Sequence, residues 1–145
     1  MERMMILKIK EIMTTDVRSI SANDSISEAA NIMKQLDVGA VPVTNNNLLV
    51  GIITDRDLIL RAVAEGKNPD ERVSTVMTKD ITTVTPDMDV HEVADLMASK
   101  QIRRVPIVEN GRLVGIVSIG DMAVEEIFEN EAGEALHTIS MGVRH

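Results

Sequence analysis

The chain has 145 residues, of which 44% are hydrophobic and 26% charged, and its net charge is −8. This composition is typical of a globular protein with one core, or with two small halves that share one. The acidic balance excludes a general nucleic-acid binder, which needs a basic surface, and Phe128 is the single aromatic residue on which a base could stack. Cysteine is absent, which excludes disulfides and thiolate metal sites.

No stretch of the sequence is expected to cross a membrane. The apolar runs fall short of the roughly 20 residues that span a bilayer. The N-terminal segment is interrupted by Lys8, Lys10 and Glu11 and lacks a small-residue cleavage site, so it does not resemble a signal peptide. We therefore expect a cytoplasmic protein without membrane or nucleic-acid partners.

An internal duplication covers most of the chain. When residue n is aligned with residue n+64, the halves match without a gap from Ile9 with Val73 to Leu58 with Met122. The repeated blocks are Ile12-Met13-Thr14 with Val76-Met77-Thr78, Val41-Pro42-Val43 with Val105-Pro106-Ile107, and Leu49-Val50-Gly51-Ile52 with Leu113-Val114-Gly115-Ile116. Two copies of such a long period do not make a solenoid. We predict two repeats, residues 7–66 and 72–130, packed across a pseudo-two-fold axis, with a short acidic helix and a tail over 131–145.

The first repeat is predicted to follow the order β-α-β-β-α. A short strand over Val17–Ile20 leads to a helix that begins after Ser25, which stands three residues before Glu28 in capping-box spacing. Apolar residues then recur at helical intervals. A strand hairpin follows, with its turn at Asn45-Asn46-Asn47, and a second helix begins near Asp55.

The second repeat is predicted to have the same order. Its strand covers Ile81–Val84, and its first helix begins after Asp89, which is paired in capping-box spacing with Glu92. The hairpin turn is Asn110-Gly111, a strong signal for a two-residue turn, and the second helix begins near Ile119. The predicted fold class is therefore α/β, with two pseudo-symmetric β-α-β-β-α repeats.

Each repeat passes from its last strand to its last helix through a hydroxyl residue and an aspartate, in Thr54-x-x-Asp57 and Ser118-x-x-Asp121. One interpretation is a helix cap, in which the hydroxyl accepts a backbone N–H bond and the carboxylate favours the positive end of the helix. The other is a binding site, in which the hydroxyl and N–H groups hold a phosphate while the aspartate accepts bonds from the two ribose hydroxyls. The two interpretations are compatible, because a cap can be released when a ligand binds.

The motifs shared by the halves resemble those of a tandem pair of CBS domains, also called a Bateman module. They are the (I/V)-M-T opening, the V-P-(V/I) hairpin entry and the G-I-(I/V)-(T/S)-x-x-D junction, and the resemblance spans about residues 7–130. It implies two αβ repeats with two clefts between them. It also implies an adenosine ligand, such as AMP, ADP, ATP or S-adenosylmethionine, and assembly as a homodimer.

The resemblance further implies which residues line each cleft. In the favoured site, Ser118 lies near a phosphate and Asp121 on the ribose, and the other members are Thr14, Ser19, Val38, Arg103 and Arg104. The mirror site is built from Thr54, Arg56, Asp57, Thr78, Thr83 and Ile102.

A basic pair distinguishes the two halves. Arg103-Arg104 precedes the hairpin strand of the second repeat, where the first repeat has Gly39-Ala40. In an acidic chain these arginines are either the local positive charge that attracts an anion or solvent-facing residues beside acidic helices. Arg56 offers a charge to the mirror cleft, although acidic neighbours on both sides can neutralise it. We expect at most one well-formed nucleotide site, in the second half.

No catalytic or metal-binding constellation is predicted. The run Gly115-Ile-Val-Ser118-Ile-Gly120 resembles a nucleophile elbow but is one residue too long. His91 is the only histidine within the repeats, and the chain has no Walker A loop. Methionines that recur in register between the halves are predicted to fill the core rather than to bind a ligand: Met13, Met33, Met77 and Met97.

The sequence thus favours a non-catalytic regulatory module that binds an adenosine nucleotide and signals to a separate, unidentified protein. We expect no enzyme activity and no required cofactor. The alternative is a structural or dimerisation module, in which both junctions serve only as helix caps. Gly39-Ala40 and Ile119-Gly120 favour this alternative, because they remove polar groups from places where a ligand would need them.

Overall fold

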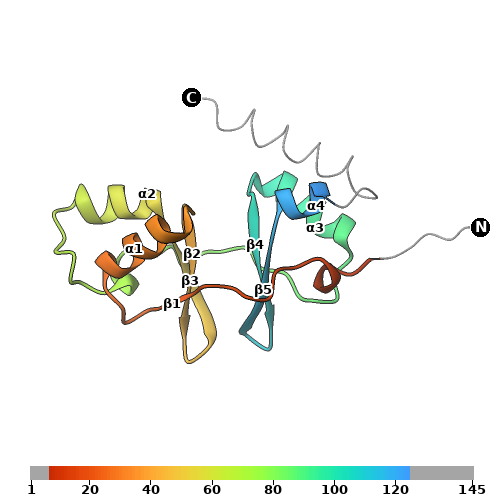
Figure 1. Ribbon diagram of the computed structural model, residues 1–145, viewed down its shortest axis with the longest axis horizontal. Helices are drawn as coiled ribbons and strands as arrows, with labels where there is room; N and C mark the ends of the chain where they lie inside the picture. The colour runs from red at the N-terminus through yellow and green to blue at the C-terminus, as the bar shows by residue number, and fades with distance from the viewer. Residues whose placement is uncertain (1–6, 125–145) are drawn as a thin grey trace, which may run out of the picture. The chain divides into compact units, whose positions relative to one another are not determined.

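The computed structural model describes residues 7–124 and has a mixed α/β architecture (Figure 1). The first half contains β1 (Ile20–Ser21), α1 (Ile26–Leu36), β2 (Ala40–Asn45), β3 (Leu48–Thr54), α2 (Asp55–Asp57) and the π-helical η2 (Leu58–Val63). The second half contains α3 (Val90–Lys100), β4 (Arg104–Glu109), β5 (Arg112–Ser118) and α4 (Ile119–Val124). Short 3₁₀ turns precede the two halves, η1 (Ile9–Glu11) and η3 (Val73–Thr75). The helix and tail expected over 131–145 lie outside the described residues.

The bounds of the elements match the duplication. When α1, β2 and β3 are shifted by 64 residues, their first and last residues coincide with those of α3, β4 and β5. The second helix of each repeat begins at Asp55 and Ile119, as predicted. The predicted α/β fold of two repeats is therefore confirmed, with one element shortened.

The second repeat lacks the full first strand that the sequence predicts over Ile81–Val84, where a single parallel bridge forms instead. In the first repeat, the N–H of Ala22 extends the ladder by donating to the carbonyl of Thr44 at 2.9 Å. Pro86 is the counterpart of Ala22 and has no N–H to donate, so the second ladder stops one residue earlier. The strand predicted over Val17–Ile20 is also shifted, because β1 begins only at Ile20, the last residue of the predicted range.

The two long helices begin where the capping pattern predicts. The hydroxyl of Ser25 accepts a hydrogen bond from the N–H of Glu28 at 3.1 Å, and the carboxylate of Asp89 accepts one from the N–H of His91 at 2.8 Å. Each of these bonds satisfies a backbone donor that the first turn leaves without an intrahelical partner. Both helices bury one apolar face, formed by Ile26, Ala29, Ile32 and Met33 in α1 and by Val90, Val93, Ala94 and Met97 in α3.

The hairpin turns also confirm the prediction. Asn46 and Asn47 have φ values of 54° and 70°, and Asn110 and Gly111 have values of 54° and 80°. Two consecutive residues of positive φ form the type I′ turn that matches the twist of the flanking strands, and Asn and Gly tolerate this conformation best.

The chain divides into two compact units that do not coincide with the sequence repeats. The 18–81 unit contains Arg18–Ile81 and Gly111–Leu113, and its strands follow the order β1-β2-β3. The 82–124 unit contains Thr82–Asn110, the residues from Val114 onward, and also the start of the chain up to Val17. We call residues 7–17 and 71–81 the leaders of the first and second repeats. Each leader therefore packs on the body of the other repeat.

Each unit has its own hydrophobic core, and a leader contributes to both. The core of the 18–81 unit consists of Ile20, Ala22, Ile26, Ala29, Ile32, Met33, Val41, Val43, Ile53, Ala62, Val73, Val76 and Met77. The core of the 82–124 unit consists of Ile9, Val84, Val90, Val93, Ala94, Met97, Val105, Ile107, Val117, Ile119 and Met122. Three of the four repeated methionines, Met33, Met77 and Met97, are buried, and Met13 packs against the second core, which confirms the prediction that they fill the core.

Equivalent backbone hydrogen bonds hold the two leaders. Thr14 exchanges bonds of 2.8 and 2.9 Å with Ile116, so the first leader runs beside β5 (red segment in Figure 1). Thr78 exchanges bonds of the same lengths with Ile52 of β3. Both bridges lie two residues before a strand-to-helix junction, so each leader passes next to a candidate site.

The repeated glycines of the L-V-G-I block are explained by this close approach. A Cβ added to Gly51 would lie 2.8 Å from the carbonyl oxygen of Thr78, and one added to Gly115 would lie 2.9 Å from Cγ of Met13. These separations are too short for carbon, so only glycine lets the leader lie flat across the strand.

Candidate ligand-binding site

The junction between β3 and α2 forms a complete capping box. The hydroxyl of Thr54 accepts a hydrogen bond from the N–H of Asp57 at 3.1 Å, and Oδ2 of Asp57 accepts one from the N–H of Thr54 at 3.0 Å. The helix cap that one interpretation of Thr54-x-x-Asp57 predicts is therefore present in the first repeat.

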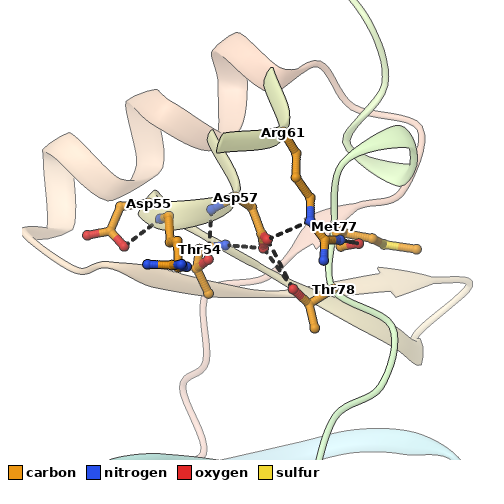
Figure 2. A network of polar contacts seen from close by, with 7 residues as sticks. Thr54, Asp55, Asp57, Arg61, Met77 and Thr78 are labelled. Carbon is orange, nitrogen blue, oxygen red and sulfur yellow. Dashed lines mark hydrogen bonds and ion pairs between the residues drawn. The ribbon is translucent and has the colours of Figure 1, made fainter. Parts of the chain in front are cut away.

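The carboxylate of Asp57 makes further contacts inside the same unit (Figure 2). Asp57 is 5% exposed and is the one buried charged side chain in the described part of the chain. The hydroxyl of Thr78 lies 3.1 Å from each carboxylate oxygen and donates to them, and Nε of Arg61 lies 3.6 Å from Oδ1. A second guanidinium nitrogen of Arg61 donates to the carbonyl of Met77 at 3.3 Å.

This network connects three parts of the 18–81 unit through one carboxylate. Thr54 and Asp57 belong to the junction, Arg61 to η2, and Met77 and Thr78 to the leader of the second repeat. A buried carboxylate is stable only when donors and a cation compensate the loss of water, and here both are present.

The corresponding junction of the 82–124 unit is built on the same backbone frame. Ser118 ends β5, and Asp121 lies in α4. The N–H of Ile119 donates to the carbonyl of Arg103 at 3.0 Å, just as the N–H of Asp55 donates to the carbonyl of Gly39 at 2.9 Å. These bonds fix the residue that precedes the hairpin strand beside the first residue of the helix.

Arg103 and Arg104 are both exposed, and within residues 7–124 neither forms an ion pair. Because the backbone of Arg103 is bonded to the junction, the pair brings two cations to the same end of this unit as Ser118. In the first half, Gly39 stands at the equivalent place, and a Cβ there would lie 3.0 Å from a carboxylate oxygen of Asp55. The basic pair is thus a feature of the second junction alone.

The structure distributes the residues of each predicted site over both units. For the favoured site, Thr14, Arg103, Arg104, Ser118 and Asp121 belong to the 82–124 unit, and Ser19 and Val38 to the 18–81 unit. For the mirror site, Thr54, Arg56, Asp57 and Thr78 belong to the 18–81 unit, and Thr83 and Ile102 to the other. Within single units, the structure brings together Thr54, Asp57 and Thr78 by direct hydrogen bonds, and Thr14 with the strand that ends at Ser118.

One contact of the first junction was not predicted from the sequence. Arg61 was not considered, although its position four residues after Asp57 on a helix is a signal for an ion pair. Among the described contacts of the Asp57 carboxylate, none involves Arg56. It lines a shallow hollow of about 300 Å³ together with Asp55, Ile59 and Leu60.

Among the described residues, no group of three or more histidine, aspartate or glutamate side chains is arranged to hold a metal ion. His91 is half-buried in the first turn of α3. In the same part of the chain, no helix has the length and apolar character needed to cross a membrane.

Duplicated β-α-β-β-α bodies, each with a leader beside a strand-to-helix junction, define a tandem-repeat α/β module. The CBS domain family model matches residues 9–63 and 73–125, and the chain belongs to this family. It is 46% identical to the CBS domain-containing protein YhcV of Bacillus subtilis over 132 residues, which cover 91% of this chain and 94% of that protein.

Two further relatives show the range of proteins that contain this module. A conserved CBS domain protein of Thermoplasma acidophilum is similar in structure, with a TM-score of 0.74 and 27% identity over 92% of this chain and 76% of that chain. The inosine-5'-monophosphate dehydrogenase of Methanocaldococcus jannaschii is 35% identical over 117 residues, but these cover only 23% of that enzyme and 79% of this chain. The similarity to an enzyme is therefore partial, and the relatives support a non-catalytic CBS module.

Proposed function

We propose that this protein is a sensor that binds an adenosine nucleotide at the junction of its second repeat and transmits the bound state to a separate protein. The observation that carries the proposal is the exposed pair Arg103 and Arg104. The carbonyl of Arg103 accepts a bond from the N–H of Ile119 at the start of α4, directly after Ser118. In a chain of net charge −8, two cations next to a hydroxyl donor form a local environment for a phosphate.

In the proposed complex, the phosphate contacts Ser118 and the arginines, and Asp121 accepts bonds from the ribose hydroxyls. Thr14, which belongs to the same unit, contacts the edge of the adenine. AMP, ADP, ATP and S-adenosylmethionine all carry the shared adenosine group. The proposal places the protein in the cytoplasm, where it meets these ligands, and gives the mirror site around Thr54 and Asp57 a weaker role.

The test is a titration of the purified protein with the four ligands while the free energy of unfolding is measured. A ligand present at 100 times its dissociation constant stabilises the folded state by about 2.7 kcal/mol. Asp121→Ala is expected to abolish this stabilisation more completely than Asp57→Ala. The absence of any shift at millimolar concentrations of all four ligands would contradict the proposal, and the reverse order of the two variants would assign the ligand to the other junction.

The basic pair provides a second discrimination. Arg103→Ala and Arg104→Ala are expected to weaken AMP binding by roughly tenfold or more, because each loses a charge-assisted contact, and to leave adenosine binding unchanged. Lys100→Ala, which removes an exposed cation at the end of α3, is the matched control. Equal weakening of AMP and adenosine would show that the arginines do not contact the phosphate.

A second candidate function, self-association as a homodimer, is favoured by an exposed apolar stripe on η2. Ile59, Leu60 and Val63 are 60%, 45% and 75% exposed. Val63→Asp is expected to shift a dimer to monomer in sedimentation velocity, because it places a charge in the buried interface. Leu48→Asp is the control, since Leu48 is 43% exposed but lies on β3. A dimer that tolerates Val63→Asp would exclude the stripe as its interface.

A further inference from the structure

The two repeats differ at the position that supplies a cation to Asp57 in the first repeat. In the first repeat, Arg61 approaches the carboxylate of Asp57 and is anchored on the carbonyl of Met77 (Figure 2). The sequence places Glu125, a residue of opposite charge, at the position 64 residues after Arg61. The other partners are preserved, because Ser118, Asp121 and Thr14 correspond to Thr54, Asp57 and Thr78.

The contacts of Asp57 occupy part of its capacity to accept hydrogen bonds from a ligand. An ionised carboxylate offers about four lone-pair sites to donors. Oδ2 accepts from the N–H of Thr54 at 3.0 Å, and the one hydroxyl hydrogen of Thr78 is shared between the two oxygens, each 3.1 Å away. Oδ1 also faces the guanidinium of Arg61 at 3.6 Å. A ribose that used this carboxylate would have to replace these donors with its own two hydroxyls.

Among the contacts of the Asp57 carboxylate, the one from Arg61 comes from a residue type that the second repeat does not retain. The bonds from Thr54 and Thr78 come from residue types that the second repeat retains, so they do not account for a difference between the repeats. The guanidinium contacts both the carboxylate of Asp57 and the leader carbonyl of Met77, so it lies between the helix and the leader beside the carboxylate. Its displacement breaks an ion pair with a buried partner and a hydrogen bond to the backbone.

We propose that Arg61 closes the first junction to the ribose of a nucleotide, and that this residue limits the protein to one nucleotide per chain. The inference rests on the proposed adenosine-binding function and names the residue that decides which junction performs it. Asp57 then serves as a fixed connection between helix and leader, and the aspartate of the second repeat is the one that we propose to bind the ligand.

The test is isothermal titration calorimetry with AMP on the full chain and on variants. The wild type is expected to bind one AMP per chain, and Asp121→Asn none. Arg61→Ala is expected to bind two, and the double variant Arg61→Ala/Asp121→Asn one. Arg61→Glu, which copies the residue of the second repeat, is a second variant for the same purpose. Lys34→Glu reverses an exposed charge in the last turn of α1 and is the control, with one AMP expected.

The outcomes separate the inference from the function on which it rests. One AMP in the wild type and still one in both Arg61 variants would overturn the inference and leave the proposed function intact. No AMP in the wild type but one in the Arg61 variants would support the inference and overturn the assignment of the ligand to the second junction. Two AMP in the wild type would overturn the inference, and no AMP in any of these proteins would overturn both.

Discussion

The contacts of Asp57 have different energetic weights, although they meet at one carboxylate. The bonds from the N–H of Thr54 and the hydroxyl of Thr78 measure 3.0 and 3.1 Å and are partly buried, and each contributes about 1.5–3 kcal/mol because the acceptor is charged. The side chain of Arg61 is 56% exposed, and an exposed i,i+4 ion pair contributes only about 0.3–0.5 kcal/mol. The hydrogen bond of Arg61 to the carbonyl of Met77 adds about 0.5–1.5 kcal/mol, so a ligand that displaces Arg61 loses about 1–2 kcal/mol, or roughly five- to thirtyfold in affinity.

The first prediction follows from this difference. Thr78→Val is expected to lower the free energy of unfolding by about 1.5–3 kcal/mol, because it removes the hydroxyl donor of a buried carboxylate. Arg61→Ala is expected to lower it by about 1–2 kcal/mol, because it removes both the ion pair with Asp57 and the hydrogen bond to the carbonyl of Met77. Urea denaturation measures both changes. A larger loss in Arg61→Ala than in Thr78→Val would show that the ion pair, rather than the hydroxyl, holds the carboxylate.

At the residue scale, the sequence predicts what the two repeats share more readily than what distinguishes them. The capping box at Thr54 and Asp57 follows from a common spacing rule, and the structure contains it. Arg61 was missed because the alignment of the halves directs attention to matched positions, and Arg61 is matched by a glutamate. Its contact with the leader carbonyl also depends on a segment 16 residues away, which no local pattern reveals.

At the scale of elements, the contact of each leader with a strand depends on a glycine. Gly51→Ala is expected to lower the free energy of unfolding by about 1–3 kcal/mol, because the new methyl group would lie 2.8 Å from the carbonyl oxygen of Thr78 and the leader backbone must move. Gly120→Ala is the matched control. A Cβ there would meet only the Ser118 hydroxyl, at 3.6 Å, and alanine favours the helix by up to about 1 kcal/mol. Thermal or urea denaturation that ranks the two variants in the opposite order would contradict this account.

The first leader also has an electrostatic connection to the loop before α3. Nζ of Lys10 lies 3.1 Å from the carboxylate of Asp87, and Nζ of Lys8 lies 3.7 Å from it. Lys10, and more weakly Lys8, lower the pKa of Asp87 below its usual value. Because the folded pKa is the lower one, the contribution to stability is present above the unfolded pKa of about 3.9 and is lost as the pH falls through the folded value.

The third prediction is the titration of this group. In an NMR titration, the carboxylate of Asp87 is expected to show a lower pKa than an exposed aspartate of the same chain, and Lys10→Ala is expected to move it back towards the ordinary value. The shift should shrink in high salt, since both partners are exposed. An unchanged pKa in Lys10→Ala would show that this contact does not form in solution.

The order of the elements was predictable, but the length of the first strand of the second repeat was not. Hydrophobic periodicity, capping residues and turn residues locate the helices and hairpins, because each signal is local. The shortened first strand of the second repeat depends on a missing N–H at Pro86, whose effect appears only when its partner strand is known. Bounds that depend on pairing between distant segments are thus less accessible from sequence than helix starts.

At the scale of the whole molecule, the exchange of leaders couples each repeat to the other. Ile9 belongs to the first repeat by sequence but is fully buried in the core of the 82–124 unit, and Val73 has the reciprocal position. The sequence alone did not predict this arrangement. The 64-residue offset aligns each leader with both bodies equally well, so it cannot assign a leader to its own repeat or to the other.

The last prediction tests this coupling. Ile9→Ala is expected to lower the free energy of unfolding by about 2–5 kcal/mol. In native-state hydrogen exchange, the amides of β4 and β5 should lose protection first. Val73→Ala should reduce protection first in β2 and β3. A loss of protection confined to the repeat that contains the substituted residue would contradict the exchange of leaders.

The exchange of leaders has a consequence for the origin of the chain. In a protein with only one such repeat, the leader could not complete the core of its own body. Such a protein would fold only as a pair of copies, in which each leader completes the core of the other copy. Gene duplication joins the two copies covalently and removes the dependence on concentration. It also frees the two copies from the requirement to remain identical, which a symmetric pair imposes on every position. Arg61 and Glu125 are one pair of equivalent positions at which the two halves have diverged.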